Sequence, residues 1–98
     1  MPGENVGQIP LGQSEIWVYA GQSGETLSIE IKTRIGLLAE VTIRDQDNNV
    51  ILRDDGNAHG GTNDLNLEVV LPVDGVYVIE ISGYFDGTGG PYTLILGD

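Results

Sequence analysis

Apolar and polar residues alternate with a period of two along most of this chain. The alternation is clearest over residues 26–33, 39–45 and 64–71, where every second side chain is aliphatic. Such a period is typical of β-strands that bury one face and expose the other, as antiparallel sheets commonly do. No stretch of comparable length has the spacing of an amphipathic helix, so the pattern predicts an all-β protein.

Two further segments are apolar on both faces. Residues 15–20 (EIWVYA) and 76–82 (VYVIEIS) have few polar positions, which predicts that both lie inside a sheet or beneath a loop. Turn-forming residues interrupt the runs at intervals of about 8–12 residues, the spacing of a sandwich or barrel. We therefore predict a single antiparallel β-sandwich domain over residues 1–98, with about eight strands. Their expected ranges are 5–9, 14–20, 25–33, 40–45, 50–53, 64–71, 76–82 and 91–97.

The chain is strongly acidic, with fifteen Asp and Glu against four Lys and Arg and a formal net charge of −11. This charge repels phosphate groups, so nucleic acids and anionic membranes are disfavoured as partners. No apolar run approaches the ~18 residues of a membrane helix, and the first residues lack the features of a signal peptide. The chain contains no cysteine. These features fit a cytosolic chain or the mature form of a secreted domain, and the acidic surplus fits solubility outside the cell or cation binding.

No catalytic signature stands out. His59 is the single histidine, and one histidine without any cysteine cannot build a zinc site. No serine lies in the G-x-S-x-G motif of a nucleophile elbow, and the glycine-rich stretches at 56–61 and 87–90 match neither phosphate-binding motif. Carboxylate pairs suited to glycoside hydrolysis are expected by abundance alone in so acidic a chain. We predict no catalytic residue and no enzymatic activity.

Three segments in order carry a resemblance to a known family. They are residues 12–31 (GQSEIWVYAGQSGETLSIEI), residues 41–51 (VTIRDQDNNVI), and residues 71–96 (LPVDGVYVIEISGYFDGTGGPYTLIL). The positions that match the family's pattern are Glu15, Trp17, Tyr19, Gly75, Tyr77, Tyr84, Gly90 and Tyr92. This ordered set resembles the bacterial pre-peptidase C-terminal domain, whose relatives include the collagen-binding domains of clostridial collagenases.

The resemblance implies a jelly-roll-like β-sandwich carried as a non-catalytic accessory domain on secreted enzymes, especially proteases. Some family members bind calcium near the N-terminus, and some bind collagen or other insoluble polymers. Glu4, Asn5 and Glu15 match the positions of the calcium ligands by residue type. The loop that contains Gln13 and Ser14 is shorter than in the calcium-binding relatives and lacks at least one of their carboxylates, whereas calcium needs six to eight oxygens.

A second candidate calcium site consists of Asp45, Asp47 and Asn49, whose spacing is like the start of an EF-hand loop. Val50 stands where such a loop needs glycine. The other interpretation is a polar hairpin tip, because Asp and Asn favour turns.

Aromatic side chains are the candidates for contact with a partner, namely Trp17, Tyr19, Tyr84 and Phe85. An aromatic at a turn can equally cover one end of a core. Tyr77 and Tyr92 share a strand face with the expected core positions, so we expect buried rings with hydroxyls at an edge. We thus expect a secreted accessory domain that binds an extracellular protein or polysaccharide, or assists a parent enzyme. The alternative is a structural module that self-associates through its sheet edges.

Overall fold

The computed structural model describes residues 3–9, 12–33, 37–61, 63–84 and 89–97. These residues form eight strands and one 3-10 turn, and they contain no helix long and apolar enough to cross a membrane. The elements are β1 (Gly3–Ile9), β2 (Ser14–Gly21), β3 (Thr26–Thr33), β4 (Ala39–Arg44), β5 (Val50–Asp55), η1 (Asn57–His59), β6 (Asp64–Val70), β7 (Gly75–Gly83) and β8 (Gly90–Gly97). Every predicted strand is present; β1 starts earlier and β5 ends later than expected.

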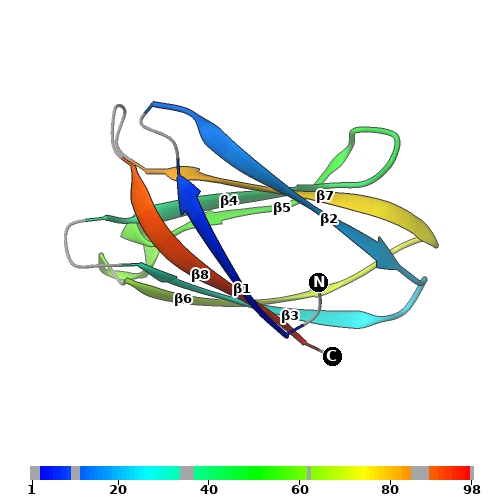
Figure 1. Cartoon of the computed structure of the whole chain (residues 1–98). Coiled ribbons are helices and arrows are strands. Elements are labelled where there is room, and N and C mark those ends of the chain that lie inside the picture. Colours follow the sequence, from blue (N-terminus) through cyan, green and yellow to red (C-terminus); the bar gives the residue numbers. More distant parts are fainter. Residues whose placement is uncertain (1–2, 10–11, 34–36, 62, 85–88, 98) are drawn as a thin grey trace.

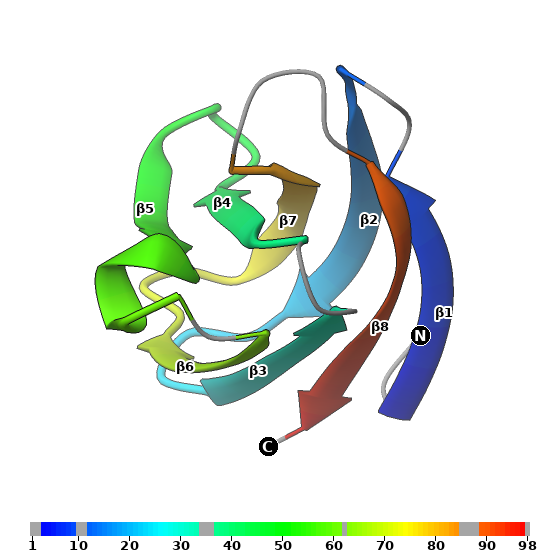
Figure 2. The same cartoon turned by 90° about the vertical axis from the view of Figure 1, so that its left-hand side faces the viewer.

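The strands form two four-stranded antiparallel sheets that pack face to face (Figures 1 and 2). The first, which we call the β3 sheet, has the order β1-β8-β3-β6. The second, the β7 sheet, has the order β2-β7-β4-β5. The predicted antiparallel β-sandwich is therefore confirmed.

The core lies between the sheets and consists of the inward-facing half of each alternating strand. β3 contributes Ile29 and Ile31 and β7 contributes Ile79 and Ile81, all at most 1 % exposed. Burying an aliphatic side chain of this size contributes about 1.5–3 kcal/mol. Because side chains alternate between the two faces of a strand, a period of two in the sequence produces this single buried layer.

Tyr77 connects the turn before β7 to the core through hydrogen bonds of its hydroxyl. Its side chain is fully buried, while its hydroxyl accepts a hydrogen bond from the Val73 backbone N–H at 3.2 Å and donates to the Val73 carbonyl at 2.5 Å. These bonds offset the cost of burying a phenol hydroxyl. Tyr92 of β8 is 3 % exposed, and its hydroxyl is also hydrogen-bonded. Both tyrosines therefore lie in the core, as predicted.

The position of β2 differs from the prediction made for residues 15–20. β7 is central, between β2 and β4, as its two-sided apolar pattern predicted, but β2 is an edge strand. Its outward side chains Ile16 and Val18 are 59 % and 54 % exposed. The prediction was wrong because it took apolar residues on both faces to mean burial of both, whereas the outer face of β2 is an exposed apolar surface.

Candidate functional site

Polar side chains of β2 and β8 meet where the two sheets approach each other. The Trp17 indole N–H donates to the Tyr92 hydroxyl, which donates to Glu15 Oε1 at 2.5 Å. The Gln8 backbone N–H donates to the same oxygen at 3.1 Å. We call Glu15, Trp17 and Tyr92 the Glu15 cluster. Burial raises the pKa of Tyr92, as does its hydrogen bond to Glu15. The phenol therefore stays protonated and keeps donating to the carboxylate, which links the two sheets.

Gly7 of β1 leaves room for this cluster. A Cβ at this position would lie 2.2 Å from Glu15 Oε1 and 2.7 Å from both Cζ and the hydroxyl of Tyr92. These separations are far shorter than van der Waals contact, so the strand can approach the cluster only because residue 7 has no side chain.

The predicted calcium ligands lie on two strands, with Glu4 and Asn5 on β1 and Glu15 on β2. Glu4 and Asn5 are neighbours on β1, so their side chains leave opposite faces of the strand. The Asn5 amide donates to the Leu94 carbonyl at 3.3 Å, and the Glu15 carboxylate accepts the bonds described above. Within the described ranges, no three His, Cys, Asp or Glu side chains are grouped so that they could hold a metal ion.

The second candidate, Asp45 with Asp47 and Asn49, closes the β4–β5 hairpin. Asp45 Oδ1 accepts hydrogen bonds from the backbone N–H groups of Asp47 and Asn49, both at 2.9 Å, and Oδ2 accepts one from the Asn49 amide at 3.3 Å. The bonds from Asn49 and Asp47 hold the pKa of Asp45 below its usual range. Asn48 adopts φ 68°, which Asn tolerates in a turn. These contacts match the polar hairpin tip, and they occupy the Asp45 carboxylate within the turn.

The aromatic candidates for partner contact lie in different environments. Tyr19 is 8 % exposed and its hydroxyl is hydrogen-bonded to a glutamate, so it belongs to the core and offers little contact area. Trp17 is half-buried and packs against the core. Tyr84 follows the end of β7 and is half-buried. Its hydroxyl accepts a hydrogen bond from the Asn57 amide of η1 at 3.2 Å. Phe85 lies outside the described residues. Tyr84 is therefore the strongest described candidate.

His59 pairs with Asp54, with 2.8 Å between Nε2 and Oδ2. The imidazole is 49 % exposed at the end of the 3-10 turn. A catalytic triad also contains a His–Asp pair, but it needs a nucleophile hydrogen-bonded to the other ring nitrogen. Within the described residues, no serine or threonine is hydrogen-bonded to this pair.

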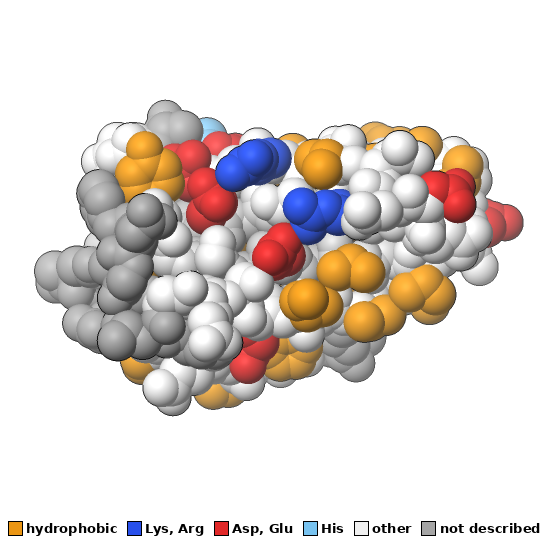
Figure 3. Space-filling model, turned by 90° about the horizontal axis from the view of Figure 1, so that it is seen from above, with side chains coloured by type: hydrophobic (Ala, Val, Ile, Leu, Met, Phe, Trp, Pro, Cys, Tyr) orange, Lys and Arg blue, Asp and Glu red, His pale blue; other side chains and the backbone are white. Residues whose placement is uncertain are grey.

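An exposed apolar surface that was not predicted lies on the outer side of the β7 sheet (Figure 3). Here Val18 lies opposite Val78, and Ala20 lies opposite Val76, which is 43 % exposed. The outward residues of β2 and β7, namely Ile16, Val18, Ala20, Val76 and Val78, are called the apolar face below. The apolar residues on both faces of segments 15–20 and 76–82 could have indicated this surface, but both segments were interpreted as buried on both sides.

Two ion pairs lie on the same side of the β7 sheet as the apolar face. Arg44 pairs with Glu80 at 2.7 Å, and Arg53 with Glu40 at 3.6 Å. The Arg44 guanidinium and the Ser14 hydroxyl hold the pKa of Glu80 below its usual range. Pairs this accessible contribute at most about 1 kcal/mol each. Their main consequence is electrostatic, since Arg44 and Arg53 each offset one carboxylate on this side of an acidic protein.

Comparison with known proteins finds similarity in structure but not in sequence. No protein-family model matches the chain, and no related curated protein is found by sequence. The crystal structure of the pre-peptidase C-terminal domain of a collagenase from Bacillus anthracis, however, has the same architecture, with a TM-score of 0.72 at 15 % identity. The match covers 99 % of this chain and 90 % of that one. The predicted resemblance is thereby confirmed at the level of structure, and the chain has the fold of a pre-peptidase C-terminal domain.

Proposed function

We propose that this chain is a non-catalytic accessory domain of a secreted bacterial protein. It binds an extracellular protein or polysaccharide, or assists a parent enzyme. The observation that carries the proposal is the similarity of fold, over 99 % of the chain, to an accessory domain of a collagenase. The ordered sequence motifs support the same assignment, and the net charge of −11 favours solubility outside the cell.

Tyr84 is the residue through which we expect polymer contact. It lies just beyond Gly83 at the end of β7 and is only half-buried, so part of its ring is open to a partner. Aromatic rings contribute a large contact area at low cost in side-chain entropy, which suits recognition of an extended polymer.

Co-sedimentation with insoluble collagen, cellulose and chitin tests this function. We expect one of these polymers to retain the wild-type domain, and the double variant Tyr84→Ala, Phe85→Ala to be retained less. Val73→Ala is a matched control, because Val73 is 47 % exposed and precedes β7 at its opposite end. Failure of every polymer to retain the wild type, or equal retention of the double variant, would count against the proposal.

Calcium stabilisation stays a prediction from the family resemblance. Melting temperatures of the wild type measured in calcium and in EDTA test it, with Glu4, Asn5 and Glu15 as the residues expected to bind the metal. A ligand that binds only the folded state at a hundredfold excess over its Kd would add about 2.7 kcal/mol. A rise in melting temperature with calcium that is lost in Glu15→Gln would establish the metal as part of the function.

Self-association is a second candidate function, and the apolar face favours it. This face includes the edge strand β2, which carries neither of the usual protections of an edge, proline or lysine. The neighbouring ion pairs offset two carboxylates on this side of the molecule, which lowers the repulsion between two copies that approach here. Light scattering after size exclusion would show a dimer for the wild type and a monomer for Val18→Lys. A monomeric wild type at high concentration would argue against this candidate.

A further inference from the structure

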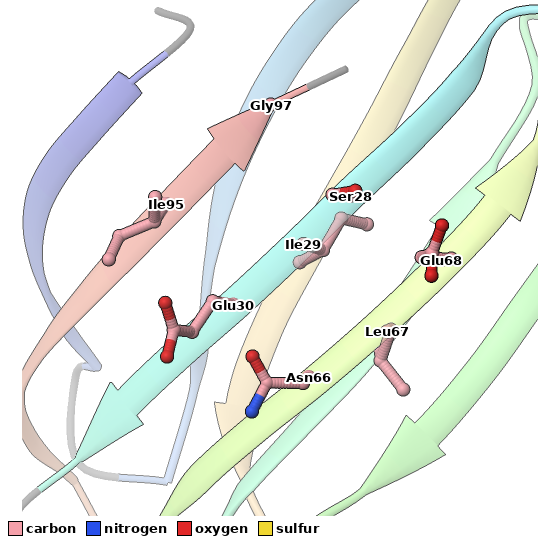
Figure 4. Close-up of a pocket in the computed structure, with 8 residues that line it drawn as sticks. All are labelled: Ser28, Ile29, Glu30, Asn66, Leu67, Glu68, Ile95 and Gly97. Atoms are coloured by element: carbon pink, nitrogen blue, oxygen red, sulfur yellow. The ribbon is translucent and has the colours of Figure 1, made fainter.

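A hollow of about 320 Å³ opens on the outer side of the β3 sheet, opposite to the apolar face (Figure 4). Strands β3, β6 and β8 line it, with Ile29 and Leu67 contributing to its floor. Its volume is at the small end of the range of about 300–1,000 Å³ for ligand pockets. The hollow therefore has room for a single side chain or a comparably small group.

Strand register explains why the surface is hollow at this point. Ser28 of β3 lies between Gly97 of β8 and Glu68 of β6, so two of three adjacent outward positions are small. In the next row, Glu30 lies between Ile95 and Asn66. The larger side chains form walls around the small ones, and Ile95 gives one wall an apolar surface.

The walls are acidic. Glu30 and Glu68 are diagonal neighbours across the β3–β6 pair, a relation that places side-chain origins about 7–8 Å apart. Glu68 forms no ion pair within the described part of the chain, and Glu30 has a long one of 3.9 Å to Lys32. A hydrogen bond shared with Asp64 raises the pKa of Glu30. The carboxylates here thus outnumber the bases.

We propose that this hollow binds a lysine or arginine side chain presented by an extended partner polypeptide. Glu30 and Glu68 would hold the ammonium or guanidinium group, while Ile95 packs against the aliphatic stem, since such stems bury readily along apolar surface. A side chain fits better than a bare metal ion, because one wall is apolar and the described carboxylates do not form a metal-binding group. The excess of carboxylates supplies the charge complementarity.

This inference rests on the proposed binding function and names one class of partner for it, a basic polypeptide. It uses none of the aromatic residues assigned to polymer contact. The two proposals can therefore fail separately. Loss of co-sedimentation in the Tyr84 variant tests the polymer contact, and loss of basic-peptide binding in variants of the hollow tests the basic-polypeptide site.

Fluorescence anisotropy with a labelled Gly-Lys repeat peptide tests the inference. The control ligand is the same peptide with every lysine acetylated, which removes the charge. The hollow variant replaces both glutamates of the hollow, Glu30→Gln and Glu68→Gln. The matched control, Asp47→Asn, Asp74→Asn, changes the net charge equally at two turns. The amide oxygen of the new side chain could still accept the hydrogen bond that Asp74 takes from the Ser23 N–H at 2.6 Å.

We expect the wild type to bind the lysine peptide, with an affinity that falls as salt concentration rises. The hollow variant should bind the lysine peptide at least about tenfold more weakly than the wild type. The affinity of the charge-matched control should change by less than about threefold. Equal loss in both variants would mean attraction by net charge alone and would overturn the site. Equal affinity for the acetylated peptide, or no binding of the lysine peptide by a folded wild type, would overturn it as well.

Discussion

Replacing Gly7 with alanine perturbs the contact between the two sheets at a defined point. The new Cβ would lie 2.2 Å from Glu15 Oε1 and 2.7 Å from the Tyr92 ring and hydroxyl. The Glu15 carboxylate is the end of a flexible side chain and can move away. The Tyr92 ring is 3 % exposed and belongs to the buried core, so it cannot yield without disturbing its neighbours there.

Two opposing terms determine the size of the effect. Gly7 is not among the positive-φ residues, so alanine fits its backbone and would gain about 0.4–1 kcal/mol by restricting the unfolded chain. Overpacking of a well-filled site costs about 1–3 kcal/mol. Displacement of Glu15 also weakens its hydrogen bond from Tyr92, typically about 0.5–1.5 kcal/mol. The losses exceed the gain, and we expect a net destabilisation of about 0.5–4 kcal/mol. Each 1 kcal/mol corresponds to roughly 4–8 °C in Tm.

Urea and thermal unfolding followed by circular dichroism measure this difference. Gly97→Ala is the control, because Gly97 is also a strand glycine but a Cβ there would meet no atom within 4 Å. We expect it to match the wild type within about 0.5 kcal/mol. If Gly7→Ala were as stable as Gly97→Ala, the close packing of β1 against the Glu15 cluster would be refuted.

Three further predictions concern stability. Tyr77→Phe, which removes two hydrogen bonds from a fully buried ring, should lower the free energy of unfolding in urea by about 1 kcal/mol, whereas Tyr84→Phe should have little effect. The pKa of Glu80 is lowered in the fold, so its contribution to stability is present at neutral pH and is lost as pH falls below the usual range of a glutamate. The melting temperature of Arg44→Gln should therefore depend less on acid pH than that of the wild type. The pKa of Glu30 is raised, so its contribution to stability is full at low pH and is lost as pH rises. Glu30→Gln should therefore raise Tm at neutral pH. A lower Tm would contradict the crowding of carboxylates beside the hollow.

The alternation of residue types was sufficient to predict the strands. Side chains such as Ile29 and Ile31 recur every second position, and this pattern determines which face of β3 is buried without knowledge of its neighbours. The same local information could not place β2 at an edge. Apolar residues on its outer face, such as Val18, look the same whether another sheet, a loop or solvent covers them.

The candidate sites depend on contacts between strands that are distant in sequence. Glu15 and Tyr92 meet only because β2 and β8 belong to opposing sheets, and no local pattern encodes that meeting. The hollow likewise arises where Ser28 comes to lie beside Gly97, through the register of β3 and β8. Residue type alone grouped Glu4 with Asn5, whereas the geometry of a strand sends their side chains to opposite faces.

If this sandwich is a binding domain that uses its outer surface, a partner should perturb residues on that surface. An NMR titration of the isotopically labelled 98-residue chain with a soluble collagen-type peptide that contains lysine measures this perturbation. We predict saturable amide shifts at Ser28, Asn66 and Gly97 around the hollow, at Tyr84 beyond β7, or at both places, with core strands unchanged. Amide shifts at none of these residues, or shifts confined to β2 that depend on protein concentration alone, would contradict it.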